Sequence, residues 1–256
     1  MLNTIISGEP HDQPPVLLVH GLFGSAKNLG GLGRRLDNSR QIISVDIRNH
    51  GNSPHDPDHS YQALADDLAA VIKVHGGTAD IVGHSMGGKA AMVLALSKPA
   101  MIRRLVVLDI APIAYHHSQQ EYIDAMQALD LLNLNLRSEA DRQLADIIDD
   151  AGVRAFLLQS LDLKAEPAHW KLNLPVLADQ MSNLVGWPGG MTMGSFTGPT
   201  LFLAGAESSY AKTGTQTAAI HTYFPQAELR YINGCGHWLH AEKPHEVADS
   251  VADFLA

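Results

Sequence analysis

The chain has 256 residues, of which 45% are apolar and 18% are charged, and this composition excludes disordered and fibrous proteins. A formal net charge of −9 argues against a nucleic-acid-binding face and against anionic membranes, and no apolar run approaches the roughly 18 residues that a membrane-spanning helix requires. Cys235 is the only cysteine, so a disulfide framework is excluded and a reducing compartment is favoured. Because the first residues also lack the features of a signal peptide, we expect a cytoplasmic protein.

Short apolar runs alternate with amphipathic segments along the first half of the chain. The run Val16-Leu17-Leu18-Val19 is apolar throughout, which is typical of a strand buried on both faces of a parallel sheet. Leu64, Leu68 and Ile72 have the spacing of one helix face. The alternation predicts an α/β fold with a mostly parallel, doubly wound sheet. The expected strands are residues 2–7, 16–19, 41–46, 79–83, 104–109, 199–205 and 227–232, and the expected helices of this layer are 28–36, 60–74, 85–96, 212–224 and 245–255.

The alternation is interrupted after the fifth expected strand, where amphipathic helices follow one another without strands between them. Gly189, Gly190 and Gly194 then predict a flexible return of the chain. We therefore expect a core of residues 1–112 and 198–256, with residues 113–197 inserted as a helical cap over the carboxyl edge of the sheet. The helices expected in the cap are residues 119–132, 138–151, 153–161 and 170–187.

The segment Gly83-His84-Ser85-Met86-Gly87 links an expected strand to an expected helix. In this Gly-x-Ser-x-Gly pattern the serine is held on a sharp turn, with its hydroxyl exposed as a nucleophile. Glycines fit on either side because a Cβ there would collide with neighbouring backbone. The pattern arises by chance in about one chain of this size in ten. Its weight therefore depends on the strands around it and on the partners that follow it.

A serine hydroxyl needs a base within hydrogen-bond reach and a carboxylate that orients the base. His237 is the predicted base, because it follows the last expected strand on a glycine loop and completes the chain order serine, acid, histidine. Asp109, at the end of the strand after the nucleophile helix, is the predicted acid. Glu207 is the alternative acid. The late position where this fold usually carries its acid holds Ser208, which we expect to add a hydrogen bond to His237.

An oxyanion formed at a substrate carbonyl needs two fixed N–H donors. We expect these to be the backbone N–H groups of Met86, directly after the nucleophile, and of Leu22, in the loop after the first buried strand. The candidates for the substrate pocket are the aromatic residues Phe23, His84, Trp187 and Trp238. Methionines could add an adaptable acyl pocket, although core packing is the default interpretation for each of them: Met86, Met126, Met181, Met191 and Met193.

Other polar residues have simpler interpretations. Asp46, Asn49 and His50 lie near the expected edge of the site, where hydrogen bonding within the loop is favoured over substrate contact. The neighbouring pair His116-His117 lacks the spacing of metal ligands, since adjacent side chains point apart. We expect no metal and no cofactor.

The chain resembles the α/β-hydrolase fold family over almost its whole length, and more narrowly it is similar to the YbfF-type acyl esterases and their relatives, the α/β-hydrolase domain-containing protein 11 group. This resemblance implies hydrolysis of carboxylesters or thioesters, with acyl-CoA-like substrates included, and it supports the early acid Asp109. Glu207 departs from the smaller polar residue that the family pattern implies at its position. The matching segments are His20-Gly21-Leu22-Phe23-Gly24-Ser25, Asp46-Ile47-Arg48-Asn49-His50-Gly51, Gly83-His84-Ser85-Met86-Gly87-Gly88-Lys89, Leu108-Asp109-Ile110-Ala111-Pro112, Trp170-Lys171-Leu172-Asn173-Leu174-Pro175 and Gly236-His237.

The sequence thus predicts a cofactor-free serine hydrolase acting on small-molecule esters or thioesters of short to medium acyl chain, with no nucleic-acid or membrane partner. Two alternatives stay open. The same scaffold could carry out C–C bond hydrolysis or a lyase reaction of the menaquinone-pathway type. A hydrolase-like receptor would instead capture a ligand without turning it over.

Overall fold

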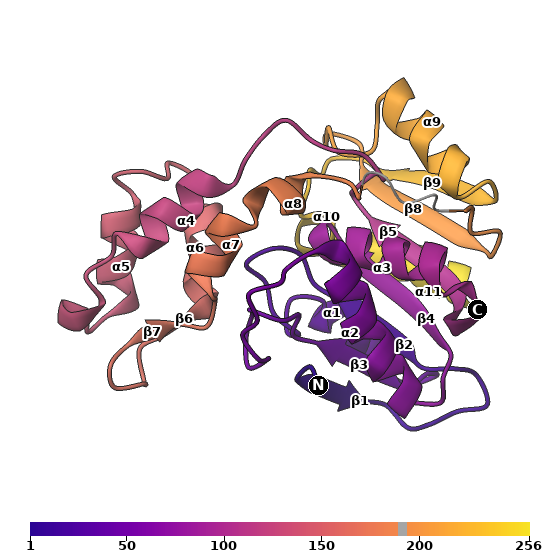
Figure 1. The fold of residues 1–256 in the computed structure, drawn as a ribbon, viewed down its shortest axis with the longest axis horizontal. Coiled ribbons are helices and arrows are strands. Elements are labelled where there is room, and N and C mark those ends of the chain that lie inside the picture. Colours follow the sequence, from indigo (N-terminus) through magenta and orange to yellow (C-terminus); the bar gives the residue numbers. More distant parts are fainter. Residues whose placement is uncertain (189–193) are drawn as a thin grey trace.

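A computed structural model describes residues 1–188 and 194–256 of the chain (Figure 1). Gly189, Gly190, Met191 and Met193, for which the sequence predicts a flexible return and a pocket, lie outside the described residues. The strands of the main sheet follow the order β1-β3-β2-β4-β5-β8-β9, and all neighbours are parallel except β1 and β3. The expected mostly parallel sheet is therefore confirmed. Its strands are β1 (Thr4–Ser7), β2 (Val16–Val19), β3 (Ile42–Val45), β4 (Ala79–His84), β5 (Ile102–Leu108), β8 (Thr200–Gly205) and β9 (Ala227–Ile232).

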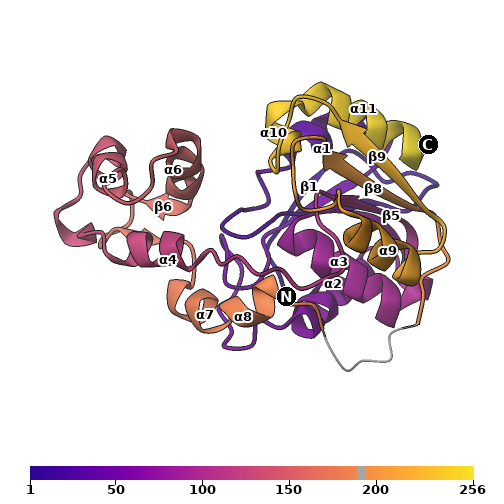
Figure 2. The same cartoon turned by 90° about the horizontal axis from the view of Figure 1, so that it is seen from above.

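Both faces of this sheet are apolar, because alternate residues of each strand point to opposite sides. Leu17 and Val19 of β2 belong to the core cluster shared with α2, α3 and α9. Val16 and Leu18 belong to the cluster shared with α1 and α11. Figure 2 shows these two helical layers on opposite sides of the strands. The helices are α1 (Gly30–Leu36), α2 (Tyr61–Val74), α3 (Met86–Ser97), α9 (Gly214–Tyr223) and α11 (Pro244–Leu255), with a short η1 (Pro99–Met101) before β5.

The carboxyl ends of the parallel strands meet at one edge of the sheet, where ligands bind in open α/β folds. Polar residues follow several strands directly at this edge. They are His20 after β2, Asp46 after β3, Ser85 after β4 and Asp109 after β5, and the loop after β9 carries His237 just before α10 (Leu239–Glu242). The topology thus gathers residues that are far apart in the sequence.

Between β5 and β8 the chain forms a group of short elements, and most of them lie to one side of the sheet in both views (Figures 1 and 2). The last of them, α8, leads back to the core. We call residues 113–188 and 194–197 the cap segment. Its elements are α4 (Gln120–Gln127), η2 (Leu131–Asn133), α5 (Arg137–Leu144), α6 (Ala151–Leu157), η3 (Leu158–Ser160), β6 (Leu161–Asp162), β7 (His169–Trp170), α7 (Leu174–Asp179) and α8 (Met181–Val185). Among residues 1–188 and 194–256, no helix combines the length and apolar character needed to cross a membrane.

The single helix expected at residues 170–187 is wrong. Trp170 instead lies in β7, which pairs with β6, and its indole Nε1–H donates to the carbonyl of Met126 at 2.9 Å. Pro175 occupies the first turn of α7, where its missing N–H leaves no hydrogen bond unmade. The chain turns again at Gln180 before α8. The hydrogen bond of the Trp170 indole, the proline at the start of α7 and the turn at Gln180 thus divide the segment into three elements.

The helix expected at residues 138–151 is also interrupted. α5 ends at Leu144, and α6 begins at Ala151. Asp150 caps this second helix, because its Oδ1 accepts the N–H groups of Gly152 at 2.7 Å and Val153 at 3.2 Å. A capping aspartate therefore starts a helix at the place where the sequence pattern indicates the end of one.

Candidate active site

Ser85 lies on the turn between β4 and α3 with a backbone φ of 51° and ψ of −118°, a conformation that non-glycine residues seldom adopt. A Cβ at Gly83 would lie 2.5 Å from the carbonyl oxygen of Gly87. A Cβ at Gly87 would collide with the carbonyl oxygen of His20. Only glycine fits at these two positions, so the turn can form and hold the serine hydroxyl away from the helix.

The structure brings Ser85, His237 and Asp109 together. His237 Nε2 is 3.0 Å from Ser85 Oγ, and His237 Nδ1 is 2.7 Å from Asp109 Oδ2. With the Nδ1–H donated to the carboxylate, Nε2 is left to accept the serine proton. The arrangement has the distances that proton transfer from a nucleophilic hydroxyl requires.

Asp109 is almost completely buried, with 1% of its surface exposed, and its backbone φ is 52°. Its Oδ1 accepts the backbone N–H of Gly205 at 3.0 Å, and its Oδ2 accepts the hydroxyl of Ser208 at 2.5 Å. A buried carboxylate needs such donors to stay charged. The last residue of β8 and the loop after it therefore supply hydrogen bonds to a carboxylate that directly follows β5.

The structure corrects the expected partner of Ser208. We expected this hydroxyl to bond His237, but it donates to Asp109 Oδ2, the same carboxylate oxygen that lies beside His237 Nδ1. Glu207, the alternative acid, is exposed, and its side chain makes no hydrogen bond to His237 among the described residues. Its backbone N–H donates to the carbonyl of Cys235 at 3.1 Å. The geometry thus places Asp109, and not Glu207, beside the imidazole.

Aromatic residues enclose His237, and the sequence analysis missed two of them. Tyr210 stacks on its ring with 4.1 Å between centroids. His84 donates from Nε2 to the His237 carbonyl at 2.9 Å, and its ring packs against His240 at 4.4 Å. Burial lowers the pKa of His84 well below its usual value and that of His240 to about 4, with the neighbouring His237 adding to the effect. One uncharged imidazole, that of His84, therefore holds the backbone of the candidate base, and a second, that of His240, packs against it.

The two expected oxyanion donors both have free N–H groups at this edge. In the described part of the chain, neither the Leu22 N–H nor the Met86 N–H has an acceptor. The next N–H along the loop, that of Phe23, is already bonded to His50 Nε2 at 3.2 Å. The hydrogen-bond pattern thus leaves the N–H of Leu22, and not that of Phe23, free to bind a ligand.

A cavity of about 300 Å³ opens above Ser85 and His237. Phe23, His84 and Trp238 line it, as do the methionines Met86 and Met181. Trp187 is not among its lining residues and instead packs against Tyr223, with ring centroids 5.7 Å apart. Met126 is buried away from the cavity. The cap segment adds mostly apolar lining residues that sequence reasoning missed: Tyr115, Tyr122, Val153, Phe156, Leu157, Leu184 and Val185.

Lys89 also lines the cavity, one helical turn after Ser85, although only 1% of its surface is exposed. Its Nζ donates to the carbonyls of Val185 at 3.1 Å and Gly186 at 2.5 Å, and it lies 4.8 Å from the centre of the Tyr115 ring. Burial lowers the pKa of its ammonium to about 7. This side chain therefore ties the end of α8 to the nucleophile helix. The four-residue spacing from Ser85 was the available sequence signal.

Comparisons with known proteins extend over nearly the whole chain. The model of the alpha/beta hydrolase fold family matches residues 14–244. The sn-1-specific diacylglycerol lipase ABHD11 of Mus musculus is 38% identical over 252 residues, covering 95% of this chain and 81% of that protein. Esterase YbfF of Escherichia coli is 39% identical over 247 residues, covering 96% and 94%. A solved structure of a marine microorganism esterase is 34% identical, with a TM-score of 0.93 over 99% of this chain and 98% of that one.

These relatives are named esterases and lipases, which confirms the expected class of ester hydrolases and the resemblance drawn from the motifs. The sheet, the strand–turn–helix around Ser85 and the matched range all point to the same family. The chain belongs to the α/β-hydrolase fold family.

Proposed function

We propose that the chain is a serine ester hydrolase in which Ser85 is the nucleophile, His237 the general base and Asp109 the acid that orients it. The observation that carries this proposal is the pair of contacts at His237, 3.0 Å to Ser85 Oγ and 2.7 Å to Asp109 Oδ2. Ser85 attacks the ester carbonyl as His237 takes its proton. The same imidazole then gives the proton to the leaving alcohol, and an acyl-enzyme remains on Ser85.

The negative charge on the carbonyl oxygen is bound by the N–H groups of Leu22 and Met86. Water, deprotonated by His237, hydrolyses the acyl-enzyme through a second oxyanion at the same place. Asp109 accepts the Nδ1–H of His237 throughout, and the two donors from Gly205 and Ser208 hold its carboxylate in place. In this assignment Ser208 acts on the acid and not on the base.

We further propose that the cap segment selects the acyl group. The cavity volume of about 300 Å³ is at the lower end of small-ligand sites, which suits a short to medium acyl chain. Its lining is largely apolar, and thioesters of such chains fit the same chemistry. The cap then corresponds to residues 113–197 and the core to 1–112 and 198–256. The net charge of −9 and the buried Cys235 favour a small-molecule substrate, no nucleic-acid partner and a cytoplasmic location.

The test is hydrolysis of p-nitrophenyl acetate, butyrate and octanoate by the wild type and by Ser85→Ala. We expect kcat of the variant to fall by at least about 10³-fold, because no other group can form the acyl-enzyme. Ser182→Ala, an exposed serine of α8, is the matched control and should keep full activity. Equal rates for wild type and Ser85→Ala would refute the proposal. Cleavage of a dienoate C–C substrate by an enzyme inert to esters would favour the C–C hydrolase, and saturable binding without turnover would favour the receptor.

A further inference from the structure

His20 and His50 form a reciprocal pair between two loops at the carboxyl edge. His20, in the loop that carries Leu22, accepts the backbone N–H of Ile47 at its Nε2, 3.0 Å away. His50, in the loop after β3, accepts the backbone N–H of Phe23 at its Nε2, 3.2 Å away. The two rings lie 5.2 Å apart. Each loop thus supplies an imidazole that binds the backbone of the other.

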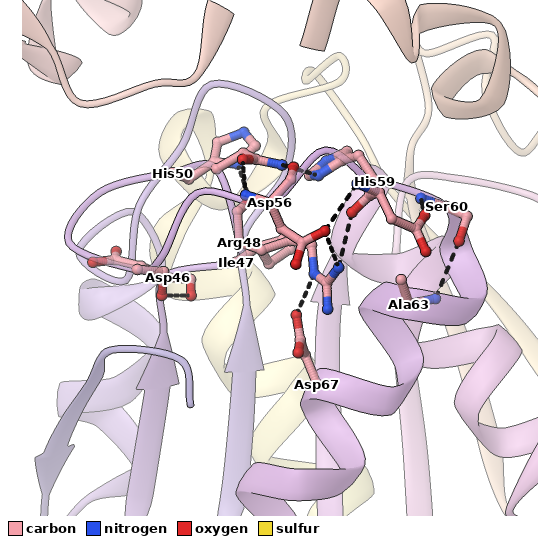
Figure 3. A network of polar contacts seen from close by, with 12 residues as sticks. Asp46, Ile47, Arg48, His50, Asp56, His59, Ser60, Ala63 and Asp67 are labelled. Atoms are coloured by element: carbon pink, nitrogen blue, oxygen red, sulfur yellow. Dashed lines mark hydrogen bonds and ion pairs between the residues drawn. The ribbon is translucent and has the colours of Figure 1, made fainter. Parts of the chain in front are cut away.

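The hydrogen bond at the other ring nitrogen fixes which tautomer His50 adopts. Its Nδ1 is 3.0 Å from the carbonyl oxygen of Arg48, which can only accept, so Nδ1 carries the proton (Figure 3). Nε2 is therefore bare and able to accept the Phe23 N–H. His50 is completely buried, and burial lowers its pKa well below the usual value, with neighbouring histidines adding to the effect. The ring is therefore a permanent neutral acceptor at neutral pH.

This acceptor has a direct consequence for the oxyanion donor. Phe23 has a φ of 64°, a left-handed conformation that bulky residues rarely adopt. The bond from its N–H to His50 fixes the peptide plane between Leu22 and Phe23. Since the Leu22 N–H belongs to the preceding peptide, its direction follows from how that plane is held. His50 therefore influences the direction of the Leu22 N–H without contacting it.

The loop that carries His50 is itself anchored at other points. Asp46 accepts the N–H groups of Ala26 at 2.7 Å and Asn52 at 2.9 Å. Arg48 pairs with Asp67 of α2 at 2.6 Å and with Asp56 at 3.3 Å (Figure 3). These contacts do not involve the His50 ring. A variant of His50 should consequently keep the loop in place.

The cap segment is bonded to the residue that precedes His50. The backbone N–H of Asn173 donates to the carbonyl of Asn49 at 2.9 Å, and its Nδ2 donates to Asn49 Oδ1 at 3.0 Å. Leu172 forms an isolated antiparallel bridge with His50. Asn49 is fully buried, and its side-chain amide also bonds the backbone of Asp56 at both ends. Hydrogen bonds to two consecutive residues, Asn49 and His50, thus link the start of α7 to the peptide between Leu22 and Phe23.

We infer that His50 is a positioning residue for the oxyanion-binding loop, and that the Asn49–Asn173 contact couples the seating of the cap to it. The inference rests on the proposed esterase function. It means that contacts of the cap affect the chemical step as well as substrate binding. His50 acts only through the backbone of Phe23 and touches no reacting atom.

The first test compares His50→Leu with His50→Gln. Leucine removes the acceptor, whereas the glutamine Oε1 can reach the Phe23 N–H. We expect kcat on p-nitrophenyl butyrate to fall about 10- to 100-fold in His50→Leu, less than the 10²- to 10³-fold loss for deleting an oxyanion donor outright. His50→Gln should recover most of this loss, and KM should stay within about twofold in both. If the leucine variant does not fold, His50→Asn replaces it, because its shorter amide cannot reach Phe23.

A trifluoromethyl ketone with the same acyl chain separates a positioning role from a general packing role. It forms a tetrahedral oxyanion on Ser85, so its affinity should fall in His50→Leu by the same factor as kcat/KM. Unchanged kcat and unchanged inhibitor affinity would overturn the inference, and so would a change in KM alone. The proposed function fails separately, if Ser85→Ala retains the activity of the wild type.

The second test concerns the cap. Asn173→Ala removes the side-chain bond to Asn49 and should lower kcat about threefold to tenfold, within the usual range of coupling effects. In the His50→Leu background the same change should have little further effect, because the acceptor through which it acts is gone. Asn183→Ala is the matched control, since this exposed asparagine of α8 bonds only Gln180 within the cap. Additive effects of the two substitutions would show that the cap is not coupled to the loop.

Discussion

The carboxyl edge of the sheet and the cap segment enclose the same cavity in different ways. At the edge, the groups with chemical roles are each fixed by hydrogen bonds. Asp109 accepts from Gly205 and Ser208, and His237 is held through its backbone carbonyl by His84. The cap contributes apolar side chains to the cavity, and they are held by packing. We expect the positions of these apolar side chains to be less strictly fixed than those of the polar groups.

This difference predicts which kinetic constants a substitution in each region should change. Catalytic groups depend on distances of about 3 Å, and a shift of about 1 Å can cost 10²-fold in rate. The free energy of an apolar contact decreases only in proportion to the contact area that is lost, at about 25 cal/mol per Å². Changes at the edge should therefore lower kcat for every ester. Changes in the cap cavity should instead alter KM and the preference for acyl length, apart from the Asn173 contact that reaches the edge.

The largest effect is expected for Asp109→Asn. An asparagine keeps the size of the side chain, but it can donate to His237 Nδ1 and so favour the wrong tautomer. We expect kcat to fall about 10³- to 10⁴-fold, with KM little changed, in steady-state kinetics on p-nitrophenyl butyrate. Glu207→Gln is the matched control, because Glu207 is exposed and its side chain does not contact the imidazole. If only Glu207→Gln lost activity, the assignment of the acid would be wrong.

The sheet could be predicted because its signals are local. The run Val16–Val19 is apolar throughout, as in a strand buried on both faces. The turn around Ser85 requires glycine at position 83 because a Cβ there would collide with the backbone of Gly87, only four residues away. Knowing that strands are parallel was enough to place Asp109 at the same edge as Ser85. The partner of Ser208 could not be predicted this way, because the direction of a hydroxyl depends on how two loops pack.

The cap was less predictable for the same reason. The periodicity of residues 170–187 suits a helix. Trp170 instead pairs with Leu161 in a short strand, and its indole donates a hydrogen bond to the Met126 carbonyl. Lys89 has the spacing of an ordinary helix residue, and only the folded chain shows the carbonyls of Val185 and Gly186 around its ammonium. The role inferred for His50 likewise depends on a neighbour 27 residues away, at Phe23.

The next prediction concerns acid stability, to which the buried histidines of the edge should contribute. Burial lowers the pKa values of His59 and His240 to about 4, whereas an unfolded histidine titrates near 6.5. Such a group stabilises the fold fully above about pH 6.5, and the contribution is lost as the pH falls toward 4, because the unfolded chain binds the proton more tightly. At pH 5.5 the loss is about 1.4 kcal/mol for each of these histidines.

Urea unfolding at pH 7.5 and pH 5.5 measures this loss. The wild type should be less stable at the lower pH, and His240→Gln should show a pH dependence smaller by about 1.4 kcal/mol, the contribution of one such histidine. His221→Gln, which changes an exposed histidine of α9, should behave like the wild type. The same free energy of unfolding at both pH values would show that these rings accept protons within the folded edge.

The smallest effect is expected for Phe156→Ala in the cap. Phe156 lines the cavity from α6 and packs near Trp238, with ring centroids 6.1 Å apart. Removing its ring takes apolar surface away from a long acyl chain, whereas a short acetyl group has little apolar surface to lose contact with. KM for p-nitrophenyl octanoate should rise about fivefold to tenfold, corresponding to about 1–1.4 kcal/mol of lost apolar contact. KM for the acetate and kcat for both esters should stay within about twofold.

Leu132→Ala controls for the general effect of shortening a cap side chain, because Leu132 is 84% exposed and does not line the cavity. Its kinetics should match the wild type for both esters. A rise in KM that is equal for acetate and octanoate would mean that Phe156 does not contact the acyl chain selectively. A fall in kcat would contradict the comparison itself, because it would show that an apolar cap residue affects the geometry of the catalytic groups at the edge. The division between a fixed polar edge and an adjustable cap therefore depends on Phe156 changing only the binding of the longer chain.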